Sequence, residues 1–280
     1  KAARKYAYKK GTGRYEFIAM KESFHGRSFG AVSVTGHDAY REPFEPLVPG
    51  VSFAQYNDLD SVKALVTDKT CAIILEPLQG EGGINAATEK FMKGIRKLCD
   101  EEGILMICDE VQCGMGRTGA MFAWQAYDIK PDIMSMAKAI GSGIPVGAFA
   151  MTEEVAKYSL EPGDHGTTYG GNPLACTAVS KTIEIFEKKH LVEHVQKVGA
   201  YLTKKLEELV EEYDTVKAVK GKGLMQGIQV TKPISEITGA ALKEGLLIIG
   251  AGSDVIRFVP PLIIELEQVD EMIRILKKAL

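Results

Sequence analysis

The chain has 280 residues, of which 45% are hydrophobic, and its 34 Lys and Arg against 37 Asp and Glu give a formal charge of -3. This composition predicts a globular protein with a large core, and the lack of a basic excess argues against nucleic acid as a partner. No run of about eighteen apolar residues predicts a membrane span, and the N-terminus has no apolar signal core, so we expect no membrane association and a cytoplasmic protein.

The first part of the chain alternates short apolar runs with amphipathic ones, which is typical of a mostly parallel sheet covered by helices. In chain order, the runs that predict strands are Tyr15–Met20, Val51–Ala54, Cys71–Glu76, Ile104–Asp109, Asp132–Ala137 and Val146–Met151. The runs that predict helices between them are Ser61–Thr67, Glu89–Glu102 and Thr152–Leu160. We therefore expect a large α/β domain over residues 1–190.

The pattern changes from Asn172, where long charged helical runs extend to about Tyr213. Short strands near Gly223–Val230 and Val255–Phe258 follow, and the chain closes with a predicted helix at Glu267–Leu280. These elements predict a smaller α+β domain over residues 191–280.

The cysteines are odd in number, lie mostly in apolar runs and lack the paired C-x-x-C spacing of a zinc site. Disulfides and a metal site are therefore not expected. We predict buried free thiols at Cys71, Cys99, Cys108, Cys113 and Cys176.

The stretch ILMICDEVQCGMGRTG, residues 104–119, contains the spacing G-x-G-x-x-G after an apolar run. A dinucleotide site needs its first glycine at the strand end and an acidic residue at the end of the next strand. Here DEVQC separates the strand from Gly114, and Asp128 and Asp132 precede the next strand. A glycine-rich surface turn is the better interpretation; a nicotinamide-dependent dehydrogenase stays as an alternative, which predicts dinucleotide binding that does not depend on Lys138.

The same stretch places Asp109 at the carboxyl end of a predicted strand, where open α/β sheets bind ligands. Successive strand side chains point to opposite faces, so Asp109 and Glu110 cannot both face one pocket, and we expect one of them to face solvent. The ordinary interpretation of such an acid is a helix cap or a solvated strand end.

A second feature is Lys138, the only charged residue between Asp132 and Glu153. Its side chain either extends to water or is held desolvated, which makes an amine nucleophilic toward carbonyls. A strand-end lysine and a strand-end carboxylate on neighbouring strands match the needs of pyridoxal phosphate. The lysine forms a Schiff base with the cofactor, and the carboxylate keeps the pyridine nitrogen protonated.

Five segments occur in the order SFHGRSFGAVSVTG, ILEPLQGEGG, ICDEVQCGMGRTG, MAKAIGSGIPVGA and HGTTYGGNPLAC. With them the chain resembles the class III (ornithine-type) aminotransferases over essentially its whole length. The resemblance implies a type I pyridoxal-phosphate fold, with a mostly parallel seven-stranded-type sheet, helices on both faces and a smaller C-terminal α+β domain. It also implies pyridoxal 5'-phosphate as cofactor and a homodimer.

The resemblance assigns five residues to the cofactor. Lys138 would be the Schiff-base lysine and Asp109 the partner of the pyridine nitrogen. Phe24 would stack on one ring face, Val111 would pack on the other, and Gln112 would lie near the phenolic oxygen. Without the resemblance, Phe24 and Val111 would be interpreted as ordinary core.

Five further residues are assigned to the phosphate and the substrates. Thr168 would reach the cofactor phosphate of the neighbouring subunit, with Thr167 near the substrate. Arg27 would bind the α-carboxylate of the donor, and Arg257 that of glutamate or 2-oxoglutarate. Glu81 would pair with Arg257 when that ligand is absent. The alternatives are turn residues for the threonines and surface salt bridges for the arginines.

The implied reaction moves the terminal amino group of a small-molecule donor to 2-oxoglutarate. The motifs are nearest to family members that act on N2-acetyl-L-ornithine in arginine biosynthesis, giving N-acetyl-L-glutamate 5-semialdehyde and L-glutamate. Ornithine, succinylornithine and 4-aminobutyrate are alternative donors, and a non-catalytic fragment or paralogue is a further alternative.

The family carries a segment upstream of the position of KAARKY, including a Ser/Gly-Thr-Glu-Ala loop that holds the cofactor phosphate at a helix N-terminus. The resemblance implies that this chain begins inside that helix. Two expectations follow: the sequence is part of a longer protein, or the protein lacks half of its phosphate site.

Overall fold

The computed structural model describes residues 1–280 as two compact units. Unit 1 comprises residues 1–77, 87–112 and 124–184, and unit 2 comprises residues 78–86, 113–123 and 185–280. Two short segments of the first part of the chain therefore pack with the C-terminal part. The units are defined by contacts between residues far apart in sequence. A single boundary near residue 190 leaves the segments 78–86 and 113–123 out of the second unit.

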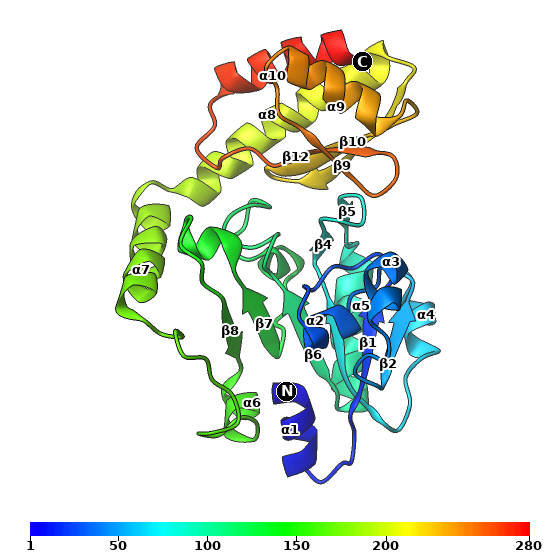
Figure 1. Ribbon diagram of the computed structural model, residues 1–280, viewed down its shortest axis with the longest axis vertical. Helices are drawn as coiled ribbons and strands as arrows, with labels where there is room; N and C mark the ends of the chain where they lie inside the picture. The colour runs from blue at the N-terminus through cyan, green and yellow to red at the C-terminus, as the bar shows by residue number, and fades with distance from the viewer. The chain divides into compact units, whose positions relative to one another are not determined.

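Unit 1 is built on a sheet with strand order β2-β1-β3-β6-β7-β8 (Figure 1). Its strands are β1 (Glu16–Met20), β2 (Val51–Ala54), β3 (Thr70–Leu75), β6 (Leu105–Asp109), β7 (Ile133–Met136) and β8 (Ala148–Met151). All neighbours are parallel except β7 and β8. All the predicted strands of this domain are confirmed. The sheet has 6 strands, where the resemblance implied a sheet of the seven-stranded type.

The helical elements of this part of the chain are mostly short. They are α1 (Ala2–Lys9), α2 (Phe29–Ser33), α3 (Asp38–Arg41), η1 (Glu42–Phe44), α4 (Leu59–Lys63), α5 (Glu89–Glu102), η2 (Ala123–Tyr127), η3 (Lys138–Gly141), α6 (Glu153–Lys157) and α7 (Pro173–Lys188). The predictions for α4 and α6 extended too far at the C-terminal end. The Asp58 and Thr152 side chains cap the N-termini of these helices, but only short helices follow.

Helix α5 shows how the sequence encodes its own position. Thr88 accepts a hydrogen bond from the Phe91 amide at the N-terminus, and Gly103 ends the helix in the left-handed region at φ 62°. Between these ends, Phe91, Met92 and Ile95 are buried in the core that lies against the sheet. The helix packs against β3 and β6, and so supports the strand that ends at Asp109.

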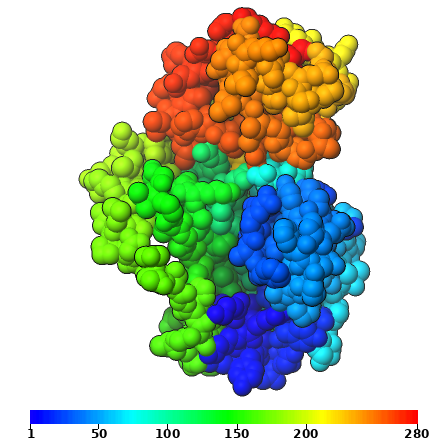
Figure 2. Space-filling model, in the orientation of Figure 1, coloured from blue at the N-terminus to red at the C-terminus, as the bar shows by residue number.

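The N-terminal helix α1 lies beside the segment that follows β8 (Figure 2). Lys5 donates to Glu161 at 2.9 Å and also pairs with Asp164. Ala2, Ala3 and Ala7 are buried on the face of α1 that contacts the sheet. Helix α1 is therefore an integral layer of unit 1.

Unit 2 is built on an antiparallel sheet with strand order β11-β12-β10-β9 (Figure 1). The elements are the hairpin β4 (Leu78–Gln79) and β5 (Asn85–Ala86), α8 (Leu191–Glu212), β9 (Val216–Lys222), β10 (Met225–Val230), α9 (Ile234–Lys243), β11 (Ile249–Ala251), β12 (Val255–Phe258) and α10 (Leu266–Ala279). Helices α8, α9 and α10 contribute to one apolar core on this sheet.

The sequence predicted β10, β12 and α10 but not β4, β5, β9, β11 or α9. Strand β9 has three lysines among its seven residues, so its sequence resembles an exposed segment more than a strand. The helical run from Asn172 divides into α7 and α8, because His190 adopts the left-handed conformation at φ 49°.

All the cysteines are free, and four are buried as predicted. Cys176 is exposed, so the prediction of a buried thiol is wrong there, because this residue lies on the exposed side of α7. None of the helices combines the length and the apolar content that crossing a membrane requires.

Candidate active site

Asp109 ends β6 and is only 6% exposed. Its Oδ2 lies 2.7 Å from His25 Nδ1, and its Oδ1 accepts from the Val111 amide at 3.0 Å and from the Ser135 hydroxyl at 3.1 Å. Burial alone would raise the pKa of Asp109. The hydrogen bonds and charge of His25, with the Val111 and Ser135 donors, outweigh burial and lower that pKa. The strand therefore ends in a buried, ionised carboxylate.

His25 is the inner partner of this carboxylate, and its side chain is 2% exposed. Burial would lower the pKa of His25, but its hydrogen bond to Asp109 and the charges of Asp109 and Glu76 raise it. Its Nε2 is buried and has no hydrogen-bond partner. The sequence interpretation missed His25 and Ser135, although His25 lies in the FHGR motif and Ser135 in a predicted strand.

The expectation that one of Asp109 and Glu110 faces solvent is wrong. Glu110 is 2% exposed, and its Oε1 accepts from the Trp124 amide at 2.8 Å. The chain turns back after β6, so a residue distant in sequence satisfies a carboxylate that the strand pattern alone would leave in water.

The glycine-rich stretch after β6 forms turns, and only the short 3-10 helix η2 follows Gly119, beginning at Ala123. The Gly116 amide bonds to the Met121 carbonyl at 3.0 Å, and a Cβ on Gly116 would lie 2.7 Å from the Phe186 ring. The predicted turn is confirmed, but its predicted surface position is wrong: Gly114 and Gly116 are buried, because Phe186 and Leu262 pack against the turn. This stretch lacks the strand–turn–helix geometry of a dinucleotide cradle.

Lys138 begins η3, directly after β7 and Ala137. Strands β6 and β7 are parallel neighbours with Asp109 opposite Ser135, so the expectation that the two strand ends adjoin is confirmed. Lys138 is exposed, which corresponds to the first of the two alternatives for its side chain. Its φ of +49° is a conformation that non-glycine residues seldom adopt and that clusters at functional sites.

Phe24 and Arg27 both contact the ring of Tyr40. The Phe24 and Tyr40 rings pack edge to face at 5.9 Å, and the Arg27 guanidinium lies 4.5 Å from the Tyr40 ring. The Phe24 amide donates to Glu76 at 2.9 Å, which ties this segment to the end of β3. Arg27 is thus exposed yet held against an aromatic ring, and Tyr40 is a contact that the sequence interpretation missed.

The other predicted residues of unit 1 differ in burial. Val111 and Gln112 are half-buried just after β6, so Val111 is not full core. Thr167 and Thr168 are exposed in a turn, where the Gly170 amide bonds to the Thr167 carbonyl at 3.3 Å.

Unit 2 brings Arg257 and Glu81 together. Arg257 lies on β12 with its side chain 8% exposed, and its guanidinium donates to Glu81 Oε1 at 2.9 Å. Glu81, in the loop between β4 and β5, is 33% exposed. The surface salt bridge considered for Arg257 is therefore wrong, because β12 is a buried central strand.

The class-III aminotransferase family model matches residues 1–280. The chain belongs to the class-III aminotransferases. It is a pyridoxal-phosphate-dependent transaminase, and family membership removes the dehydrogenase alternative.

Curated relatives and solved structures agree with this family. Acetylornithine aminotransferases of Aquifex aeolicus and Methanocaldococcus jannaschii are 45% and 46% identical to this chain. The alignments cover 100% and 99% of the chain and 72% and 69% of the relatives. A PLP-bound amine transaminase from an uncultivated Pseudomonas species matches with a TM-score of 0.93 at 30% identity, over 99% of this chain and 72% of that chain. The ornithine aminotransferase of Toxoplasma gondii matches with a TM-score of 0.93 at 29% identity, over 99% and 68%.

The carboxylate and the amine at these strand ends of the class-III aminotransferase fit pyridoxal phosphate. A protonated pyridine nitrogen needs an ionised carboxylate, and Asp109 is buried with a lowered pKa. The aldehyde of the cofactor needs a primary amine, and Lys138 follows the neighbouring strand. These two chemistries converge at adjacent strand ends, which is where open α/β sheets bind ligands.

Proposed function

We propose that this aminotransferase moves the terminal amino group of N2-acetyl-L-ornithine to 2-oxoglutarate, giving N-acetyl-L-glutamate 5-semialdehyde and L-glutamate, a reaction of arginine biosynthesis. The curated relatives named acetylornithine aminotransferase support this donor. The observation that carries the chemistry is the buried carboxylate of Asp109 beside the strand that leads to Lys138.

Pyridoxal phosphate, when bound, supplies an electron sink for the carbon that loses its proton. Asp109 would hold the ring nitrogen, and Lys138 would bind the cofactor aldehyde. Phe24 and Val111 would contact the two ring faces, and Gln112 would lie near the phenolic oxygen.

Lys138 has a second role in this proposal. With the donor bound, the free amine of Lys138 would take the proton from the substrate carbon that carries the transferred amino group, and the same lysine would later return that proton. Its exposed position after β7 allows the side chain to move between these tasks. Asp109 stays fixed throughout, because three donors hold its two oxygens.

In this proposal the two arginines bind the carboxylates of different substrates. Arg27 would bind the donor α-carboxylate, and Arg257 would bind the α-carboxylate of 2-oxoglutarate. The half-exposed Glu81 occupies Arg257 in the absence of the acceptor. Thr167 would lie near the substrate.

We also propose a homodimer in which Thr168 contacts the cofactor phosphate of the neighbouring subunit. Tyr169 and Leu174, beside it in sequence, are 80% and 70% exposed. Large apolar side chains that are this exposed are typical of a face that a partner covers. Light scattering after size exclusion measures the mass; a monomeric holoenzyme would contradict this part of the proposal.

The decisive experiment combines pyridoxal phosphate with the protein, fixes the adduct with borohydride and locates the modified peptide by mass spectrometry. We expect the label on Lys138 and its loss in Lys138→Ala, with Lys157→Ala as the control at an exposed lysine of α6. Label retained in Lys138→Ala would overturn the assignment.

A donor panel at fixed 2-oxoglutarate then tests the substrate. N2-acetylornithine should have the highest kcat/KM among acetylornithine, ornithine, succinylornithine and 4-aminobutyrate. A higher value for another donor would replace the proposed substrate without changing the role of Lys138. A protein that carries the label but turns over no donor would support the non-catalytic alternative.

A further inference from the structure

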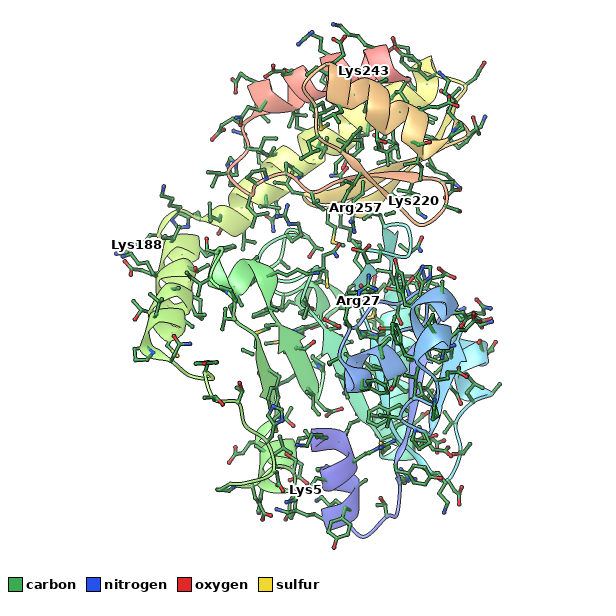
Figure 3. The ribbon with its side chains drawn as sticks, in the orientation of Figure 1. Lys5, Arg27, Lys188, Lys220, Lys243 and Arg257 are labelled. Carbon is green, nitrogen blue, oxygen red and sulfur yellow. The ribbon has the colours of Figure 1, made fainter.

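Lys220, Gly227 and Arg257 lie in one row across the sheet of unit 2. Gly227 on β10 is paired with Lys220 on β9 and with Arg257 on β12. Residues directly opposite each other in antiparallel strands point their side chains to the same face. Figure 3 labels Lys220 and Arg257, which both lie on the sheet of unit 2. Because the residue between them is a glycine, the two cationic side chains flank a strip of backbone without a side chain on this face.

The hairpin β4–β5 covers that strip with Ile84. Ile84 is fully buried, and a Cβ added to Gly227 or Gly221 would lie 3.4 Å or 2.7 Å from its side chain. Its φ of +54° is rare for a branched residue. Ile84 keeps this strained conformation because the glycines of the sheet leave room for its side chain.

Two cations hold the hairpin on either side of Ile84. Arg257 donates to Glu81 at 2.9 Å, and Lys220 Nζ donates to Asn85 Oδ1 at 2.6 Å. The Asn85 amide in turn donates to the Gly82 carbonyl at 2.8 Å, so the Lys220 contact fixes the loop as well as the strand. Burial lowers the pKa of Lys220, in agreement with its enclosed position.

We infer that Lys220 is a positioning residue that keeps the loop of residues 80–84 on the sheet while Glu81 leaves Arg257 for the acceptor carboxylate. This inference rests on the proposed function of Arg257 and Glu81. It assigns the two cations different tasks: Arg257 exchanges its partner, and Lys220 keeps its own.

The geometry makes the two contacts interdependent. While both are formed, loss of Lys220 leaves the other contacts of the loop in place, among them the Glu81 side chain on Arg257, the buried Ile84 and the bond from the Gly252 amide to the Glu81 carbonyl at 2.9 Å. When the acceptor occupies Arg257, the Glu81 side-chain contact is gone. Loss of Lys220 therefore penalises the acceptor-bound state more than the other states.

Amide hydrogen exchange of residues 80–85 in the holoenzyme tests this interdependence without substrate. Lys220→Met and Glu81→Gln should each accelerate exchange by less than about twofold, and the double variant by about tenfold or more, well above the roughly fourfold that additive effects would give. Lys217→Met, at an exposed lysine of β9, is the control and should change nothing. Effects that simply add, or an unchanged double variant, would overturn the inference.

Steady-state kinetics then separate positioning from general stability. In Lys220→Met, the KM for 2-oxoglutarate should rise about three- to tenfold while the KM for the donor changes less than about twofold. Lys220→Arg, which keeps the cation, should restore the acceptor KM. Equal changes in both KM values would overturn the inference. Absence of turnover with 2-oxoglutarate in the parent protein would instead overturn the proposed function, and the exchange experiment would still decide the role of Lys220.

Discussion

In unit 1, His25 and Asp109 form a pair of 2.7 Å in which the two side chains are 2% and 7% exposed. In unit 2, Arg257 and Glu81 form a pair of 2.9 Å in which Arg257 is 8% exposed and Glu81 is 33% exposed. The first pair is enclosed, and further donors hold the acid in place. The second joins a buried cation to an acid that borders solvent.

This difference indicates which charge is fixed and which can exchange. Removing an enclosed partner leaves an uncompensated buried charge, whereas a partly exposed acid can exchange its contact for water. Under the proposed function, the fixed charge of Asp109 would serve the cofactor, and the replaceable partner of Arg257 would give way to the acceptor carboxylate.

Asp109→Asn should have the largest effect on activity, because it removes the charge of the enclosed acid. The amide keeps an oxygen acceptor but loses the charge, so we expect the single-turnover rate with saturating donor to fall on the order of 100- to 1000-fold. Asp128→Asn, at an exposed residue, is the matched control. A rate within about threefold of the parent would contradict the role of the fixed carboxylate.

Glu81→Gln, which neutralises the exchangeable partner of Arg257, should have a smaller effect. Without the acid, Arg257 is open to α-carboxylates at all stages, so glutamate should gain as a donor relative to N2-acetylornithine. We expect the ratio of the two kcat/KM values to shift by about five- to tenfold, equivalent to roughly 1 kcal/mol. Glu236→Gln on the exposed start of α9 should leave the ratio unchanged; an unchanged ratio in Glu81→Gln would show that Glu81 does not cover Arg257.

Tyr40→Leu tests whether Arg27, like Arg257, depends on a held position. The guanidinium lies 4.5 Å from the Tyr40 ring, and such a contact contributes about 0.5–1 kcal/mol at an exposed site. The KM for the donor should therefore rise about two- to fivefold. Tyr40→Phe keeps the ring and should behave like the parent, so an equal effect of both variants would contradict this explanation.

The enclosed pair should also give the smallest effect, a pH dependence of stability. Because the pKa of His25 is raised on folding, its contribution is complete below its unfolded value of about 6.5 and is lost as pH rises through the folded pKa. Because the pKa of Asp109 is lowered, its contribution is present above about 3.9 and is lost as pH falls through the folded pKa.

Thermal unfolding of the parent and of His25→Asn, measured from weakly acidic to alkaline pH, checks this sign. The Tm advantage of the parent should be greatest near and below pH about 6.5 and should shrink by a few degrees above it. His190→Asn, at an exposed histidine, should show no such trend. A parent advantage that grows with pH would contradict the raised pKa.

The sequence by itself determined the strands of unit 1, the order of Asp109 and Lys138 along them and the family. Local patterns sufficed because a strand in a parallel sheet is an apolar run, and the carboxyl ends of neighbouring strands meet at one edge. The absence of a dinucleotide cradle in the glycine-rich stretch was also predictable, because DEVQC separates the first glycine from the strand.

Only the tertiary structure decided which polar groups are enclosed. Glu110 is buried because its carboxylate accepts a hydrogen bond from the Trp124 amide, and His25 pairs with Asp109 from 84 residues away. Ile84 packs in a strained conformation against Gly221 and Gly227, and Lys220 reaches Asn85 from 135 residues away. These outcomes depend on partners that are remote in sequence, and a hydrophobic period carries no information about a partner that folding alone brings into contact.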